Sequence, residues 1–136
     1  PKGARPVIFP ARPTITNKTL VVVEGIFDAI KAYDCGMKNV ICTFGTSAAL
    51  VKTTMEAIIS TANMLGCTRV ILALDNDPAG ATTTEKLTEF LESRVPMVET
   101  FNWQKLVDMI GKDVKDFGEL DKEDFFAVQA VLYTKT

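Results

Sequence analysis

Two apolar runs of this chain end abruptly in carboxylates, and this pattern constrains the fold more than any other. The runs are 20–23 and 70–74, and the acids that follow them are Glu24, Asp28, Asp75 and Asp77. Apolar runs rich in β-branched residues are typical of buried parallel strands, and open α/β sheets place their sites at the carboxyl ends of such strands. We therefore expect an α/β sheet that gathers these acids at one edge.

Carboxylates that are brought together repel one another unless a hard divalent cation lies among them. The chain contains no histidine, so oxygen ligands are expected to dominate. The sequence thus predicts a site for Mg²⁺, or for Mn²⁺, with Asp75 and Asp77 as ligands. N-capping is the alternative for Asp77, because Pro78 follows it at the first position of an expected helix.

Glu24 ends a run of four apolar residues, where a carboxylate is costly unless it has a function or a partner. We expect a role in the site, and Gly25 beside it would let a backbone or a ligand approach closely. An exposed strand end or a salt bridge is the alternative for Glu24.

The remaining chain alternates expected strands and helices. Strands are expected at 19–23, 39–43, 69–74 and 95–100, and helices at 26–34, 47–65, 79–91 and 124–132, with a less certain region at 103–118. Ser47 is a plausible N-cap of the second helix, and Phe27, Ile30 and Tyr33 form an apolar face of the first. This order predicts a mostly parallel four-stranded sheet with helices on both faces.

The length of 136 residues indicates one domain, here 19–136 with a closing helical extension. Residues 1–18 contain four basic residues, four prolines and no acid, which predicts an extended connector from an upstream domain. Because the first residue is proline, we expect the chain to be a piece of a longer protein. No stretch approaches the roughly 18 apolar residues of a membrane span. Three cysteines without Cys-x-x-Cys spacing indicate neither zinc nor disulfides, so the cytoplasm is the expected compartment.

Glu24-Gly25 and Asp75-Asn76-Asp77, about fifty residues apart, resemble the Toprim domains of topoisomerases, bacterial-type primases and some nucleases. That family carries a Glu-Gly pair after its first strand and Asp-x-Asp after its third. The resemblance implies a Toprim fold, which is Rossmann-like, with bound Mg²⁺. It also implies that Glu24 is a catalytic general acid/base or a metal ligand.

The segments 23–30, 36–40, 44–47 and 77–80 resemble the bacterial and phage primase branch of this family. This resemblance places Asp28 in the acidic site, although an acid in the first turn of a helix is favoured by the helix dipole in any case. It also suggests phosphate binding, with simple capping as the alternative for Ser47. The residues implied in phosphate binding are Gly25, Gly45, Thr46 and Ser47.

The segment 111–120 resembles the Lys-Asp element that supplies a further acid in primase-like Toprim domains. Two Lys-Asp pairs are present. Asp116 matches better because Phe-Gly-Glu-Leu follows it, and Asp113 is the second candidate. An ordinary charged loop is the alternative for both.

The resemblance implies Mg²⁺-dependent nucleotidyl transfer in primer synthesis. Its partners would be single-stranded DNA template, nucleoside triphosphates and other domains of the parent protein, which can include a helicase. The chain itself has no P-loop motif. Two alternatives stay open: a Toprim nuclease of the overcoming-lysogenization-defect or ribosomal-RNA-maturation type, and a noncatalytic nucleic-acid-processing module.

Overall fold

The computed structural model describes residues 8–10 and 12–133. Its strands are Thr19–Val23 (β1), Val40–Cys42 (β2), Arg69–Leu72 (β3) and Met97–Thr100 (β4). Its helices are Ile26–Asp34 (α1), Thr46–Ala49 (α2), Lys52–Met64 (α3), Pro78–Leu91 (α4), Trp103–Ile110 (α5) and Asp124–Tyr133 (α6), with a 3₁₀ turn at Phe117–Glu119 (η1). No helix in these described ranges is long and apolar enough to cross a membrane.

The four strands form one parallel sheet in the order β2-β1-β3-β4. The central strand β1 pairs with both β2 and β3, so that Val21 lies opposite Val40 on one side and Ile71 on the other. Parallel strands end at the same edge of a sheet. The residues after β1 and β3, which include Glu24 and Asp75, therefore lie at neighbouring strand ends, as the sequence predicted.

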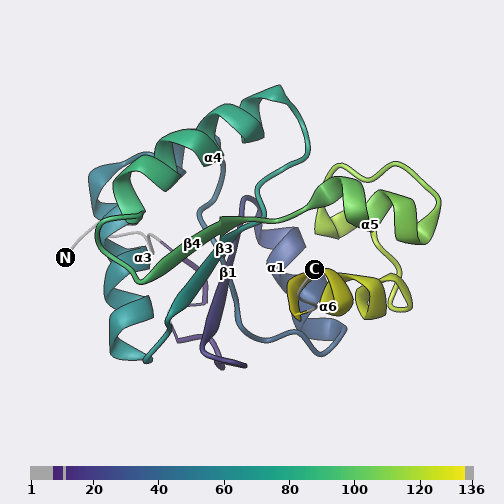
Figure 1. The fold of residues 1–136 in the computed structure, drawn as a ribbon, viewed down its shortest axis with the longest axis horizontal. Helices are drawn as coiled ribbons and strands as arrows, with labels where there is room; N and C mark the ends of the chain where they lie inside the picture. Colours follow the sequence, from purple (N-terminus) through teal and green to yellow (C-terminus); the bar gives the residue numbers. More distant parts are fainter. Residues whose placement is uncertain (1–7, 11, 134–136) are drawn as a thin grey trace.

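Helices cover both faces of the sheet (Figure 1), which confirms the expected α/β architecture. On β1, Val21 and Val23 belong to a core that includes residues of α1 and α6, whereas Leu20 and Val22 belong to a core with α3 and α4. This alternation follows from the period of two along a strand. Strand β1 is buried on both faces, and this explains its continuous apolar run.

The predicted apolar face of Phe27, Ile30 and Tyr33 is not the buried face of α1. Phe27 is 78% exposed and Ile30 is 41% exposed. The buried residues of α1 are Asp28, Ala29 and Ala32. Two alanines allow the helix axis to lie close to the sheet, and Asp28 is turned inward by hydrogen bonds described below.

The single helix expected from Ser47 is divided into α2 and α3. Val51 has an extended backbone (φ −72°, ψ 134°) and forms the N-cap of α3, consistent with the β preference of a β-branched residue. Gly45 is the N-cap of α2, so Ser47 lies inside that helix rather than at its cap. The second half ends near Gly66, whose φ of +71° is in the left-handed region.

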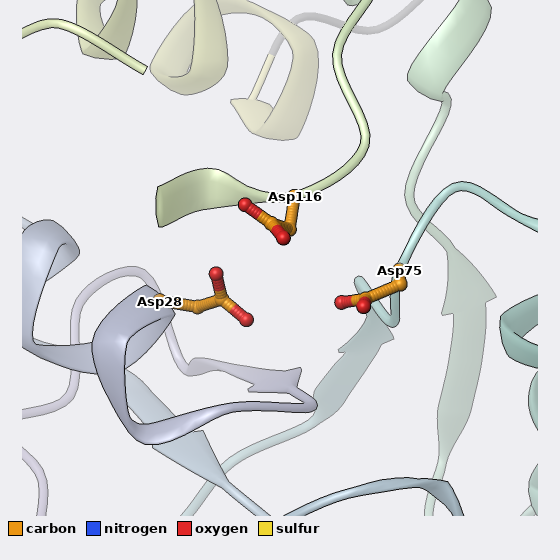
Figure 2. A group of neighbouring side chains, drawn as sticks. All are labelled: Asp28, Asp75 and Asp116. Atoms are coloured by element: carbon orange, nitrogen blue, oxygen red, sulfur yellow. The ribbon is translucent and has the colours of Figure 1, made fainter. Parts of the chain in front are cut away.

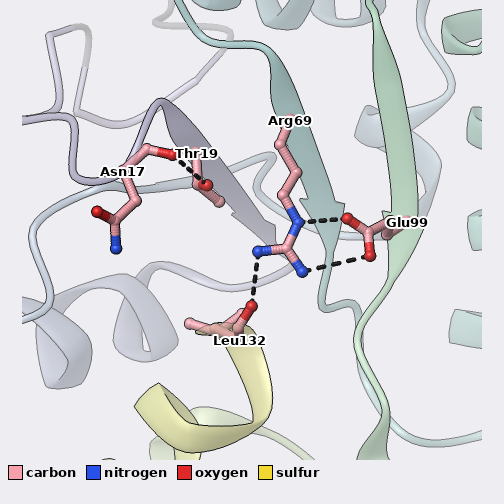
Figure 3. A network of polar contacts seen from close by, with 5 residues as sticks. All are labelled: Asn17, Thr19, Arg69, Glu99 and Leu132. Atoms are coloured by element: carbon pink, nitrogen blue, oxygen red, sulfur yellow. Dashed lines mark hydrogen bonds and ion pairs between the residues drawn. The ribbon is translucent and has the colours of Figure 1, made fainter. Parts of the chain in front are cut away.

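Arg69 at the start of β3 ties the sheet to the last helix (Figure 3). Its guanidinium donates two hydrogen bonds to the carboxylate of Glu99 on β4. A third donor, Nη1, lies 2.6 Å from the backbone oxygen of Leu132 in α6. The fork of an arginine suits such a three-way link.

Gly80, in the first turn of α4, is required by a close backbone approach. Its N–H donates to Asp77 Oδ1 at 2.7 Å. A Cβ atom at this position would lie only 2.0 Å from the backbone oxygen of Asp75. The turn that carries Asp75 therefore fits against α4 only when residue 80 has no side chain.

We predict that Gly80→Ala destabilises the chain, although helix propensity alone would favour alanine by about 1 kcal/mol. The backbone clash should outweigh that gain and lower the free energy of unfolding by about 2 kcal/mol. Chemical denaturation monitored by circular dichroism measures the change. Ala81→Gly, at the next and exposed position, is the control for propensity and should cost about 1 kcal/mol. A stabilised Gly80→Ala variant would contradict the packing described here.

Candidate metal centre

Three carboxylates from distant parts of the chain meet at the carboxyl edge of the sheet (Figure 2). Asp28 comes from the first turn of α1, Asp75 follows β3, and Asp116 is the N-cap of η1. Each offers an oxygen, and these oxygens all lie within 4.8 Å of one another. We call these three residues the aspartate triad.

Asp28 is the most buried member of the triad, with 6% of its surface exposed. Its Oδ2 accepts a hydrogen bond from Gly25 N–H at 3.1 Å, and its Oδ1 accepts one from Gly118 N–H at 2.9 Å. The first bond belongs to helix capping, and the second binds a segment ninety residues further along the chain. Asp28 therefore caps α1 and also lies in the acidic cluster, and its role as a metal ligand stays a prediction.

Asp116 is positioned by bonds on both sides. Its Oδ1 accepts from Glu119 N–H at 3.1 Å. Asn76, between the two aspartates of the Asp-x-Asp motif, donates its N–H to Lys115 O at 2.6 Å and its Nδ2 to Val114 O at 2.9 Å. The loop after β3 thus holds the Lys-Asp element directly. Asp113, the other candidate for the further acid, is exposed and is not among the clustered residues.

Phe117 anchors the same segment in the core. It is 1% exposed and packs edge-to-face against Phe101, with ring centroids 5.4 Å apart, and against Phe125 at 5.7 Å. Trp103 contacts both Phe101 and Phe117 and donates its Nε1–H to Leu74 O at 3.0 Å. An aromatic cluster between α5, η1 and α6 therefore fixes the position of the neighbouring Asp116.

Glu24 and Asp77 lie next to the triad but outside it. Glu24 Oε1 faces the backbone N–H of Asp75 at 3.4 Å. Asp77 caps α4 through Gly80, as its capping interpretation requires, and its Oδ2 lies 3.8 Å from Lys115 Nζ. Their roles as metal ligands remain predictions.

The expected phosphate-binding residues are only partly available to a ligand. The N–H of Gly25 is engaged by Asp28, and the N–H of Gly45 donates to Glu24 O at 2.8 Å. This hydrogen bond from Gly45 therefore stabilises the turn that contains Glu24. Thr46 and Ser47 begin the short helix α2, and phosphate binding by them remains a prediction.

Burial and mutual repulsion make these carboxylates hard to ionise. Burial, and then the charges of Asp116 and Asp75, raise the pKa of Asp28 to about 6. Burial, followed by the charges of Glu24, Asp116 and Asp77, raises the pKa of Asp75 to about 6. The pKa of Glu24 is also raised, first by burial. The charge of Lys115, which forms an ion pair with Asp77, opposes the rise in the pKa of Glu24 and of Asp75.

The donor set fits a hard divalent cation. All three side chains offer carboxylate oxygens and come from separate backbone segments, and no basic side chain in the described part of the chain forms an ion pair with them. Oxygen ligands of this kind suit Mg²⁺ and Mn²⁺. A cation among them would offset the repulsion that raises their pKa values.

The sequence interpretation missed the residues that position the triad, chiefly Asn76, Phe117 and Gly118. Asn76 stands in the Asp-x-Asp motif at the unspecified place, so its bonds to 114–115 had no sequence signal. Phe117 and Gly118 belong to the Phe-Gly-Glu-Leu segment that favours Asp116, but the segment gives no signal for their packing. A Cβ at Gly118 would lie 3.1 Å from Asp28 Oδ1 and 3.2 Å from Asp116 Oδ1, so a small residue there serves the site.

We predict that the metal-free chain loses stability as pH rises from about 4 to about 6. The pKa values of Asp28 and Asp75 are higher in the folded chain than in the unfolded chain, so the folded state binds more protons in this window. The free energy of unfolding therefore falls as the pH rises and these protons leave. Urea denaturation in a chelator, at several pH values, measures this. Asp28→Asn should flatten the decline and Asp113→Asn should not. A rise in stability over this window would contradict the assigned shifts.

Three comparisons with known proteins complete this description. The chain matches the primase fragment of the bacteriophage T7 primase-helicase protein with a TM-score of 0.51 and 21% identity, over 84% of this chain and 41% of that chain. It therefore spans less than half of that fragment, and at this identity the likeness concerns the fold. No curated protein matches the chain. The family model of the Toprim domain matches residues 18–99, more than half of the length, and the chain belongs to that family.

Proposed function

We propose that this chain is the catalytic metal-binding domain of a primase-type nucleotidyltransferase, which synthesises primers on single-stranded DNA with Mg²⁺. The aspartate triad with Glu24 beside it carries the proposal. Support also comes from the primase-like motifs around Glu24 and Asp28 and from the fold shared with the T7 primase fragment.

In this proposal Asp28, Asp75 and Asp116 hold the cation. When bound, Mg²⁺ would neutralise the triphosphate and lower the pKa of the attacking 3′-hydroxyl. The protein contributes rigidity: two backbone donors fix Asp28, and the aromatic cluster fixes the segment of Asp116. Groups held in place before the reaction spare the reorganisation that free groups would need.

Glu24 is suited to move a proton beside this centre. It lies 3.4 Å from the N–H of Asp75 and is only partly buried, so substrate can reach it. Its raised pKa brings it closer to the range in which a carboxyl group both accepts and releases protons near neutral pH. A direct role as an additional metal ligand would use the same position.

The net charge of the chain bears on how it would bind its template. Its net charge is −2, so attraction to a template must come from metal, from the basic residues 1–18 and from other domains of the parent protein. We propose single-stranded DNA and nucleoside triphosphates as substrates. Residues 1–18, of which Ile8 and Phe9 contact the sheet domain, would lead from a template-holding domain. A helicase can be a further domain of the parent.

The first prediction of this function concerns metal binding. Asp75→Asn and Asp116→Asn should each weaken Mn²⁺ binding by about tenfold or more, because each removes one of three charged ligands. Isothermal titration calorimetry at pH 7.5 measures the affinity. Asp77→Asn should have a smaller effect, because the Asp77 carboxylate already accepts a hydrogen bond from Gly80 N–H and forms an ion pair with Lys115. Asp113→Asn is the matched exposed control. Undiminished binding in the two triad variants would refute the assignment of the site.

The second prediction concerns Glu24. In the parent enzyme, Glu24→Gln should lower the rate by about 100-fold or more, with little change in melting temperature. The assay supplies labelled single-stranded DNA, ribonucleotides and Mg²⁺ and scores extension or cleavage on a denaturing gel. Glu123→Gln, an exposed position, is the control. A near wild-type rate would make Glu24 structural, and Mg²⁺-dependent cleavage without extension would identify a nuclease.

A further inference from the structure

Strand β4 forms one edge of the sheet, and its outer side is not paired with any strand among residues 8–10 and 12–133. The opposite edge is treated differently. There, Phe9 and Cys42 of β2 exchange two backbone hydrogen bonds of 3.1 and 2.7 Å. The described chain therefore covers the edge at β2 and leaves the edge at β4 open.

The backbone groups on the open side can be assigned from the ladder. The N–H of Phe101 donates to Leu72 O of β3 at 2.9 Å. Since successive residues of a strand point their N–H and C=O groups to opposite sides, Val98 and Thr100 direct theirs away from the sheet. These groups are available to an added strand.

A cavity of 740 Å³ lies beside this edge, between α4 and the end of β4. Its apolar part includes Leu72, Leu74 and Trp103, and Thr100 of β4 also lines it. Such a volume and lining are typical of pockets that receive a ligand or a side chain.

The charged residues that line this cavity are all acidic, although one of them, Asp77, forms an ion pair with Lys115. Glu85 and Glu89 on α4 and Asp77 at its N-cap line it together with Asp75, and no Lys or Arg is among the lining residues. Glu85 and Glu89 are exposed and form no ion pair with described residues. A cationic occupant would therefore be attracted, whereas a nucleic-acid backbone would be repelled.

The opposite face of the edge is different in character. A smaller cavity of 220 Å³ there is lined by Arg69, Glu99 and Lys105, and the carboxylate of Glu99 is engaged by Arg69 (Figure 3). Side chains of an added strand alternate between the two faces. Every second side chain of the added strand would enter the acidic cavity. The side chains between them would face the smaller cavity, where Glu99 is already paired with Arg69.

We propose that the edge of β4 binds an extended segment of a partner protein in which Lys or Arg alternates with small apolar residues. The segment adds a strand through Val98 and Thr100 and places its basic side chains in the cavity rimmed by Glu85 and Glu89. This is strand addition with alternate-residue specificity. Pairing of two copies of this chain through β4 is disfavoured, because it would bring two acidic rims together. The proposal goes beyond nucleotidyl transfer and does not depend on it.

The test uses the whole chain and a fluorescent peptide, Lys-Val-Lys-Val-Arg-Val with blocked ends. Fluorescence anisotropy should show saturable binding, and amide signals of Val98 and Thr100 should shift in NMR spectra. Glu85→Lys with Glu89→Lys should weaken binding by about tenfold or more through charge reversal. Glu56→Lys with Glu123→Lys, two exposed positions that do not line the cavity, changes the net charge by the same amount. This matched control should weaken binding much less.

Backbone pairing is tested separately. Thr100→Pro removes an outward N–H, which an edge strand tolerates, and should weaken binding by a similar factor. A peptide N-methylated on alternate residues blocks the same bonds without changing the protein, so the test stands even if Thr100→Pro does not fold. An affinity that changes neither on N-methylation of the peptide nor on charge reversal of the protein would overturn the proposal. So would a dimer of this chain that Thr100→Pro abolishes, or single-stranded DNA that competes for the same amides.

Discussion

The buried carboxylate of Asp28 is the contact on which the site depends. It accepts hydrogen bonds from the N–H groups of Gly25 and Gly118. One side chain therefore connects the turn after β1 to the segment before α6. Burying a carboxylate is costly, and these two donors offset part of that cost. The remainder appears as the raised pKa of Asp28. The fold thus stores electrostatic strain at the position where a cation would relieve it.

The rest of the site is built around this contact by small residues and close backbone approaches. Gly80 lets α4 press against the backbone of Asp75, and Gly118 leaves room between the oxygens of Asp28 and Asp116. Asn76 then joins the turn after β3 to residues 114–115 through two hydrogen bonds. Because each of these contacts involves at least one backbone atom, a small shift of one element would move the carboxylates relative to one another.

The sequence predicted the sheet and the strand ends well because their signal is local. About ten consecutive residues suffice to recognise a buried strand that ends in an acid, as at Glu24 and Asp75. The positions of Phe27, Asn76 and Phe117 depend on contacts across the fold and have no such signal. An apolar face on α1 was expected by helical periodicity, but the aspartate contacts turned Asp28 inward instead. The choice of Asp116 over Asp113 came from a resemblance, and the bonds of Asn76 supply its physical reason.

The turn at residues 75–77 adjoins two acidic surfaces that differ in burial, and Asp75 contributes to both. This difference in burial decides what each surface can bind. On the α1 side, the triad is partly desolvated and its oxygens converge within 4.8 Å, so a small cation that replaces protons is favoured. On the α4 side, Glu85 and Glu89 are exposed and rim a wide cavity. Exposed carboxylates keep their water and give a bare cation little gain, but they attract long, flexible ammonium or guanidinium side chains whose stems can lie on the apolar floor. In the two proposals, this turn would contribute to a metal site on the α1 side and to a peptide site on the α4 side.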